Sequence, residues 1–173
     1  MDGKIHVMYS EEQIDARIRE LGAAVSADLN GEPVHLVCVL KGASFFACEL
    51  AKRMTVPVYM DFMCVSSYGN NTRSSGEVRI VKDLDDSVEG QHVLIAEDII
   101  DSGNTLHFLL EEFQKRGAAD VRICALLSKP DRRETEVPAD YIGYVIPDVF
   151  VVGYGLDYAQ MYRNLPYIGV LDI

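Results

Sequence analysis

The amino-acid sequence predicts an α/β protein with a mostly parallel, twisted sheet and helices on both of its faces. Short, mostly apolar runs that contain β-branched residues occur at 34–40, 93–96 and 121–127. Strands buried on both faces have this pattern, and amphipathic helix patterns separate the runs. Alternating strands and helices build a parallel sheet. Because 173 residues is the size of one domain, we expect a single domain over 1–173.

The spacing of apolar residues and the residues that end helices or strands predict the elements of the first half of the chain. Ser10 followed by Gln13 is a capping-box pattern, and apolar residues then recur at helical spacing from Ile14 to Leu29. Lys41-Gly42 ends the first buried strand. After the first helix we expect a strand over 34–40, a helix over 44–53, a strand over 57–65, a long polar loop over 66–76 and a short strand over 78–81.

In the second half, the strand over 93–96 runs into acidic residues and a helix follows. The apolar face of this helix consists of Leu106, Leu109, Leu110 and Phe113. Gly117 suits the position after its last turn. The strand over 121–127 comes next. Two further runs, 141–146 and 149–153, are separated by a Pro-Asp turn, which predicts a hairpin-like addition to the core.

Charge and composition exclude several classes of protein. A formal net charge of −11 argues against a nucleic-acid-binding protein, which would show a basic face. No apolar run approaches the ~20 residues of a membrane span, and residues 1–4 do not begin a signal-peptide pattern. The cysteines, Cys38, Cys48, Cys64 and Cys124, lie in apolar segments without CxxC spacing. We expect buried, reduced thiols and a cytoplasmic protein without nucleic-acid or membrane partners.

The segment 93–105, VLIAEDIIDSGNT, is the most informative. In open α/β sheets, ligands bind beyond the carboxyl ends of the strands, where the next helix directs its free N–H groups outward. The residues before and at the start of this helix, Ser102, Gly103, Asn104 and Thr105, could therefore wrap a phosphate. Glu97 and Asp98 would repel a phosphate, and instead suit ribose hydroxyls or a metal ion. Taken alone, these residues also fit a solvated acidic turn with Thr105 as a helix cap.

Two apolar residues, Glu97-Asp98, two apolar residues and then Asp101-Ser102-Gly103-Asn104-Thr105 resemble the phosphoribosyl pyrophosphate signature of the type I phosphoribosyltransferases. The resemblance implies that family's fold, with a small hood formed by terminal segments, and Mg²⁺ as cofactor. It implies that Glu97 and Asp98 orient the ribose and hold the metal, that residues 101–105 bind the 5′-phosphate, and that Asp101 is the general base for the purine proton.

Lys41-Gly42 resembles the pyrophosphate loop of the same family, in which a cis peptide would join Leu40 and Lys41. By itself, Lys-Gly after a strand indicates only a turn. Arg163 matches a pyrophosphate-contacting arginine. Ser67-Tyr68, at the start of the long loop, matches a pair that closes over the reaction, and the resemblance implies a lid here.

Further matches are similar to the 6-oxopurine branch of the family. Lys129 matches the lysine that recognises the purine 6-oxo group. The segment 146–158 resembles the base-binding segment, in which Phe150 stacks on the purine, Val151 offers backbone groups and Asp157 ligates magnesium. The resemblance therefore implies transfer of a 5-phosphoribosyl group from phosphoribosyl pyrophosphate to N9 of hypoxanthine or guanine, which yields IMP or GMP in purine salvage.

Two other classes of protein remain as alternatives. A regulator that senses phosphoribosyl pyrophosphate and binds nucleic acid would show a basic face or an added DNA-binding domain. A flavodoxin-like or receiver-type signalling domain would not need Lys129, Phe150 and Ser67-Tyr68 together. The family resemblance also implies a homodimer or homotetramer. The preference among hypoxanthine, guanine and xanthine stays open.

Overall fold

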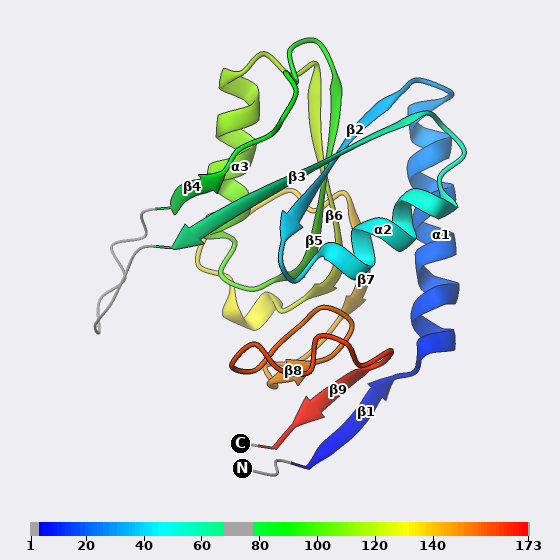
Figure 1. The fold of residues 1–173 in the computed structure, drawn as a ribbon, viewed down its shortest axis with the longest axis vertical. Coiled ribbons are helices and arrows are strands. Elements are labelled where there is room, and N and C mark those ends of the chain that lie inside the picture. The colour runs from blue at the N-terminus through cyan, green and yellow to red at the C-terminus, as the bar shows by residue number, and fades with distance from the viewer. Residues whose placement is uncertain (1–3, 68–77, 173) are drawn as a thin grey trace.

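The computed structural model describes residues 4–67 and 78–172 and shows two sheets (Figure 1). Its elements are β1 (Ile5–Tyr9), α1 (Glu11–Leu29), β2 (Val34–Leu40), α2 (Ser44–Arg53), β3 (Val58–Ser67), β4 (Val78–Lys82), β5 (His92–Ile100), α3 (Asn104–Lys115), β6 (Asp120–Ser128), the 3₁₀ helix η1 (Pro130–Arg132), β7 (Tyr141–Val145), β8 (Val151–Val152) and β9 (Ile168–Leu171). Six strands form the main sheet, in the order β4-β3-β2-β5-β6-β7, and three short strands form the second, in the order β1-β9-β8.

The main sheet is mostly parallel, as predicted. β2 pairs in parallel with β3 and β5, β5 with β6, and β6 with β7, whereas β4 is antiparallel to β3. The carboxyl ends of the parallel strands therefore meet at one edge. We call β1, β8, β9 and residues 146–167 the hood, and it faces this edge (Figure 1).

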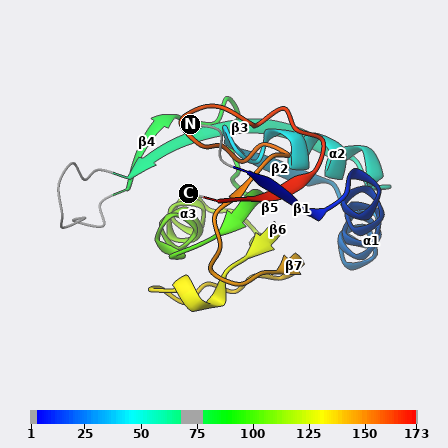
Figure 2. The same ribbon diagram turned by 90° about the horizontal axis from the view of Figure 1, so that it is seen from below.

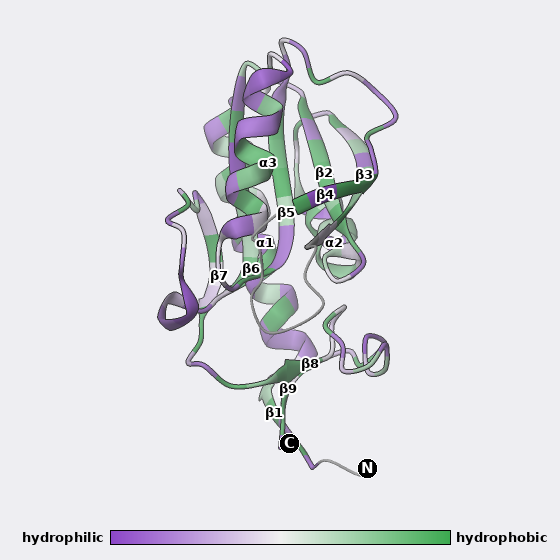
Figure 3. Cartoon of the chain, turned by 90° about the vertical axis from the view of Figure 1, so that its left-hand side faces the viewer, coloured by the Kyte–Doolittle hydropathy of each residue, from purple (hydrophilic) through white to green (hydrophobic). Residues whose placement is uncertain are grey.

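Helices cover both faces of the main sheet, which confirms the predicted layers. Seen from below, α1 and α2 lie on one side and α3 on the other (Figure 2). Alternation along β2 divides the core: Leu36 and Cys38 pack with α1 and α2, whereas Val37 and Val39 pack with α3. The hydrophilic side of α3 faces outward (Figure 3). The predicted capping box is formed by Ser10 and Gln13, each side chain accepting a hydrogen bond from the other residue's backbone N–H.

Some predictions of local structure were wrong. The runs 141–146 and 149–153 do not form a hairpin, because β7 joins the main sheet parallel to β6 while β8 pairs with β9 in the hood. The hood strands β1 and β9 have no counterpart among the predicted elements; they are short and depend on each other across the chain. The predicted loop over 66–76 begins too early, because Ser66 and Ser67 pair with β4 as the end of β3, and residues 68–76 of that loop lie outside the described residues.

The cysteines are free, as predicted. Cys38 and Cys124 are buried and Cys64 is partly buried, but Cys48 on α2 is exposed, which corrects the expectation that all four are buried. Among the described residues, none of the helices combines the length and apolar character needed to span a bilayer.

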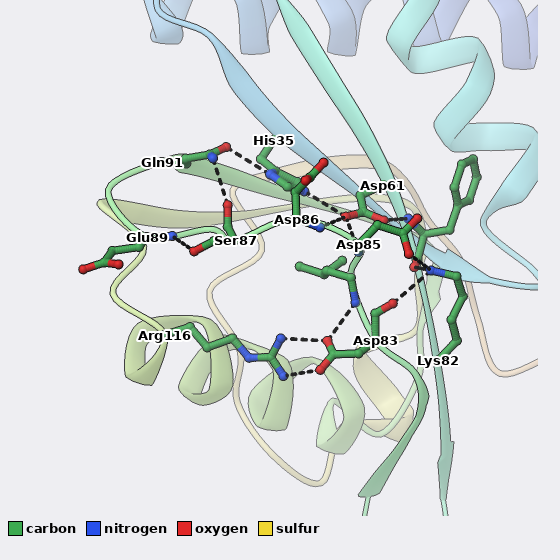
Figure 4. A network of polar contacts seen from close by, with 12 residues as sticks. His35, Asp61, Lys82, Asp83, Asp85, Asp86, Ser87, Glu89, Gln91 and Arg116 are labelled. Atoms are coloured by element: carbon green, nitrogen blue, oxygen red, sulfur yellow. Dashed lines mark hydrogen bonds and ion pairs between the residues drawn. The ribbon is translucent and has the colours of Figure 1, made fainter.

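A buried polar network ties β2 and β3 to the connection after β4, at the end of β2 away from the hood (Figure 4). Asp61 Oδ1 accepts from the N–H of Phe62 at 2.7 Å, and its Oδ2 accepts from those of Asp85 and Asp86 at 2.9 and 3.3 Å. His35 Nε2 lies 3.4 Å from Oδ2. Burial by itself raises the pKa of Asp61, but these backbone donors and His35 outweigh it, so the pKa lies below its usual value.

We expect Asp61→Asn to lower the free energy of unfolding at pH 7 by about 1–3 kcal/mol, because buried donors lose a charged acceptor. A lowered folded-state pKa stabilises the fold above the unfolded pKa of about 3.9, and this contribution is lost as pH falls through the folded-state pKa. The difference between wild type and variant, measured by urea unfolding, should therefore shrink below about pH 4. Asp85→Asn is the control, since its exposed side chain pairs only with Lys82 at 3.2 Å in the described part of the chain. A pH-independent difference would contradict this role of Asp61.

Candidate active site at the sheet edge

A small cup lies where β5 gives way to α3. Gly103, the residue before α3, has φ 86°, in the left-handed region that favours glycine. A Cβ at Gly103 would also overlap the carbonyl oxygen of Thr135. The cup has a volume of about 150 Å³ and is lined by Glu97, Ile99, Ile100, Asp101, Ser102, Gly103, Thr105 and Leu106. The first N–H groups of a helix have no acceptor within the helix, so those of α3 are available to an anion in the cup.

Residues 133–135 support this cup from behind. The N–H groups of Glu134 and Thr135 donate to the carbonyl of Ser102 at 2.9 and 3.0 Å. Asn104 Nδ2 donates to Glu134 Oε2 at 2.9 Å, and Asn104 Oδ1 accepts from the Thr135 hydroxyl at 2.6 Å. These contacts hold the Asn104 carboxamide against the supporting segment, and the N–H of Asn104 donates to the Ser102 hydroxyl at 3.3 Å.

Glu97 and Asp98 form a carboxylate pair at the end of β5. Burial and the neighbouring charge of Asp98 raise the pKa of Glu97 well above its usual value. Burial also raises the pKa of Asp98. Two carboxylates in such a position favour a proton, a cation or hydroxyl donors. The pair can thus bind either a divalent ion or a polyol.

The predicted pyrophosphate loop, Lys41-Gly42, packs between β5 and the hood. The peptide that joins Leu40 and Lys41 is cis, as the family resemblance implied. A Cβ at Gly42 would overlap Asp98 Oδ2, and a Cβ at Gly155, which has φ 99°, would overlap the carbonyl oxygen of Gly42. Glycine is thus required at both positions by close approach: Gly155 of the hood packs on Gly42, and Gly42 packs on Asp98.

Gln160 contacts both of the predicted pyrophosphate-binding cations, Lys41 and Arg163. Its Oε1 accepts from Lys41 Nζ at 3.2 Å and from Arg163 Nη2 at 3.4 Å. Arg163 also pairs with Asp157 Oδ1 at 2.8 Å and donates to the carbonyl of Gly155 at 2.7 Å. The structure therefore brings Lys41, Arg163 and Asp157 together. Tyr158-Ala159-Gln160 is part of the family resemblance, but the sequence assigns Gln160 no role; in the structure it lies between two cations that would otherwise repel each other.

The other predicted base-binding residues, Lys129, Phe150 and Val151, lie at the end of β6 and in the hood. Lys129 follows β6, and its N–H donates to the carbonyl of Ile100 at 2.9 Å, which ties it to the end of β5. The Lys129 side chain is only 10% exposed, and its Nζ lies 3.7 Å from Asp148 Oδ1. Phe150 is partly exposed and meets the ring of Tyr158 edge-on at 5.6 Å. Val151, in β8, is buried in the hood.

Asp101 is half-exposed at the rim of the cup. Its Oδ1 lies 3.2 Å from Nε of Arg132 in η1. Arg132 and Asp148 were not singled out from the sequence, where each looks like an ordinary surface charge. Of the predicted lid pair, Ser67 is the last residue of β3, and Tyr68 lies outside the described residues.

Comparisons with known proteins show the family to which a chain with this site belongs. A family model described as "Phosphoribosyl transferase domain" matches residues 8–159. The chain therefore belongs to the phosphoribosyltransferase family. Within it, the chain is 54% identical to the hypoxanthine-guanine phosphoribosyltransferase of Bacillus subtilis over 165 residues, 95% of this chain and 92% of the relative. This places it in the hypoxanthine-guanine phosphoribosyltransferase branch.

Other relatives agree with this assignment. The chain is 54% identical to the "Bifunctional protein TilS/HprT" of Listeria monocytogenes, but spans only 26% of the length of that relative. A crystal structure of a hypoxanthine phosphoribosyltransferase from Staphylococcus aureus superimposes with a TM-score of 0.94 at 48% identity, and the match covers 99% of this chain and 92% of that one. A hypoxanthine-guanine phosphoribosyltransferase from Bacillus anthracis also gives a TM-score of 0.94, at 42% identity and over 99% of this chain and 100% of that one.

Proposed function

We propose that this site transfers the 5-phosphoribosyl group of phosphoribosyl pyrophosphate to N9 of hypoxanthine or guanine, with release of pyrophosphate. One observation carries the proposal: the phosphate-sized cup, the Glu97-Asp98 pair and the Lys41–Gln160–Arg163 cluster lie along one sheet edge. These groups suit, in turn, the 5′-phosphate, the ribose hydroxyls and the pyrophosphate of a single donor molecule.

Each group has a distinct task in this reaction. The N–H groups at the start of α3, with the hydroxyls of Ser102 and Thr105, hold the 5′-phosphate. Lys41 and Arg163 neutralise charge on the departing pyrophosphate. Asp101 takes or stabilises the purine proton as N9 attacks C1′.

The purine base is recognised by Lys129, Phe150 and Val151. Lys129 donates to the 6-oxo group: its side chain is only 10% exposed, and its ammonium donates no hydrogen bond to a protein group within residues 4–67 and 78–172. Phe150, which is 38% exposed, offers a stacking surface, and the backbone of Val151 reads the base edge. The recognition of a carbonyl acceptor by a cation excludes the adenine amino group.

The residues at this edge fit magnesium. Glu97, Asp98 and Asp157 supply carboxylate oxygens, the ligands that Mg²⁺ prefers. Within the described ranges, no three His, Cys, Asp or Glu side chains gather as a ready-made metal cluster. Mg²⁺ is often held by one or two carboxylates together with substrate phosphates. When bound, it would supply positive charge to the pyrophosphate and ribose oxygens.

The proposed reaction also determines the substrates that we expect the protein to bind. The substrates are phosphoribosyl pyrophosphate and a 6-oxopurine, with no nucleic acid or membrane involved. The free cysteines support a cytoplasmic location, because thiols stay reduced there.

A homodimer or homotetramer is supported by a cavity of about 760 Å³ between α1, α2 and the hood. Phe45, which is 44% exposed, lines it beside Cys48 and Tyr154. If a second copy covers this face, light scattering should give a mass at least twice the 19.3 kDa of one chain. Phe45→Glu should then shift the protein to monomers, whereas Val81→Glu, at an exposed site on β4, should not. A monomeric wild type would contradict this part of the proposal.

The reaction itself is tested by release of pyrophosphate from phosphoribosyl pyrophosphate and Mg²⁺. Release should require hypoxanthine or guanine and match the amount of nucleotide formed. Release that is independent of the base would indicate hydrolysis of the donor and contradict the proposed transfer.

A further inference from the structure

Two charged residues that have no assigned task lie between the proposed base-recognising lysine and the proposed general base. Asp148 Oδ1 is 3.7 Å from Lys129 Nζ, and Asp148 Oδ2 is 3.8 Å from Arg132 Nη1. Arg132 Nε is 3.2 Å from Asp101 Oδ1. The four residues form a row of alternating charge, which we call the charge chain: Lys129, Asp148, Arg132 and Asp101.

Lys129 is the buried member of the charge chain. Within residues 4–67 and 78–172, Asp148 is the one carboxylate within ion-pair distance of its ammonium group. Asp148 itself is 49% exposed, so it offers its charge to Lys129 from the solvent side. The separation of 3.7 Å is too long for a direct hydrogen bond, so the N–H donors of Lys129 stay available to a ligand. Asp148 therefore steadies the ammonium group without using up its donors.

The backbone holds both linking residues at the same strand ends. The N–H of Ile146 donates to the carbonyl of Ser128 at 2.9 Å, which fixes the segment that carries Asp148 beside the end of β6. The N–H of Arg132 donates to the carbonyl of Lys129 at 3.2 Å. The positions of Asp148 and Arg132 thus follow from the strand ends that carry the site.

We propose that Asp148 and Arg132 are positioning residues for the purine: Asp148 orients the Lys129 ammonium toward the 6-oxo group, and Arg132 orients the Asp101 carboxylate toward the ring proton. This inference rests on the proposed function. Asp148 also lies 3.8 Å from Arg132, so the two positioning residues are neighbours. Asp148 acts through Lys129 on binding, whereas Arg132 acts through Asp101 on chemistry.

With hypoxanthine as substrate, replacing Asp148 should change mainly KM, whereas replacing Arg132 should change mainly kcat. Asp148→Asn should raise KM for hypoxanthine by roughly 10-fold, because a charge-assisted contact is weakened, with kcat and the donor KM within about twofold. Arg132→Gln should lower kcat by roughly 5- to 10-fold with a smaller change in KM for hypoxanthine. Asp148→Glu should recover most of the wild-type KM. Asp131→Asn is the matched control, since Asp131 is exposed in the same short helix and forms no ion pair with any described residue.

A double-mutant cycle decides whether Asp148 acts through Lys129. In the Lys129→Met background, Asp148→Asn should change KM for hypoxanthine by less than about twofold. An equal rise in both backgrounds, or no rise in wild type, would overturn the inference. A Lys129→Met variant with wild-type KM would overturn it as well. Failure of the wild-type protein to form IMP would instead contradict the proposed function. Thermal unfolding of each variant shows whether a kinetic loss is only a loss of fold; at 49% exposure, Asp148 should leave stability nearly unchanged.

Discussion

Replacing Asp101 with asparagine should lower turnover by roughly 10²-fold or more, the range for loss of a general base. Asp101 stands at the rim of the cup and pairs with Arg132 at 3.2 Å. An amide keeps the size of the side chain but does not take up the purine proton. Single-turnover formation of IMP measures this step apart from product release.

Binding of the donor should survive this change, because the N–H groups at the start of α3 hold the 5′-phosphate. The control is Asp131→Asn, which removes a nearby exposed carboxylate and should stay within twofold of wild type. A loss of only about twofold in Asp101→Asn, with chemistry shown to be rate-limiting, would remove Asp101 from the role of base.

Replacing Lys129 with methionine should weaken the use of hypoxanthine or guanine by roughly 10- to 150-fold in kcat/KM. A hydrogen bond to a charged group contributes about 1.5–3 kcal/mol, which gives this range. Methionine fills a similar volume in the 10%-exposed position but has no donor. The ratio of 6-oxopurine to adenine efficiency should fall too, since Lys129 also repels the adenine amino group.

The comparison is kcat/KM for hypoxanthine and adenine in wild type and variant, at saturating donor and Mg²⁺. Lys115→Met is the control, because Lys115 is an exposed cation at the end of α3. An unchanged hypoxanthine efficiency in Lys129→Met would leave Lys129 without a role in base recognition, even if phosphoribosyl transfer stands.

The main sheet was predictable because burial on both faces leaves a local signal. β2, β5 and β6 each contain a mostly apolar run, and α1 carries its own capping box at Ser10. The site signals were local too: Gly103 and the acids before it lie within one strand-loop-helix unit. Such patterns need no knowledge of distant partners.

The hood and the supporting residues of the site could not be predicted in this way. β8 has only two residues, and it pairs with β9 rather than with the nearby β7, a choice that no hydrophobic period records. Asn104 turns to Glu134 because residues 133–135 fold back on the loop, which is a tertiary contact. Gln160 lies between two cations only because the hood packs on the sheet edge, which brings it close to Lys41.

Base competition tests the central claim most directly. The wild-type protein is given limiting phosphoribosyl pyrophosphate, Mg²⁺ and equal concentrations of hypoxanthine, guanine and adenine, and the nucleotides are separated and quantified. IMP and GMP should account for nearly all of the product, with one pyrophosphate released for each nucleotide. AMP formed at a comparable rate, or no nucleotide from any base with folded protein, would contradict a 6-oxopurine phosphoribosyltransferase site at this sheet edge.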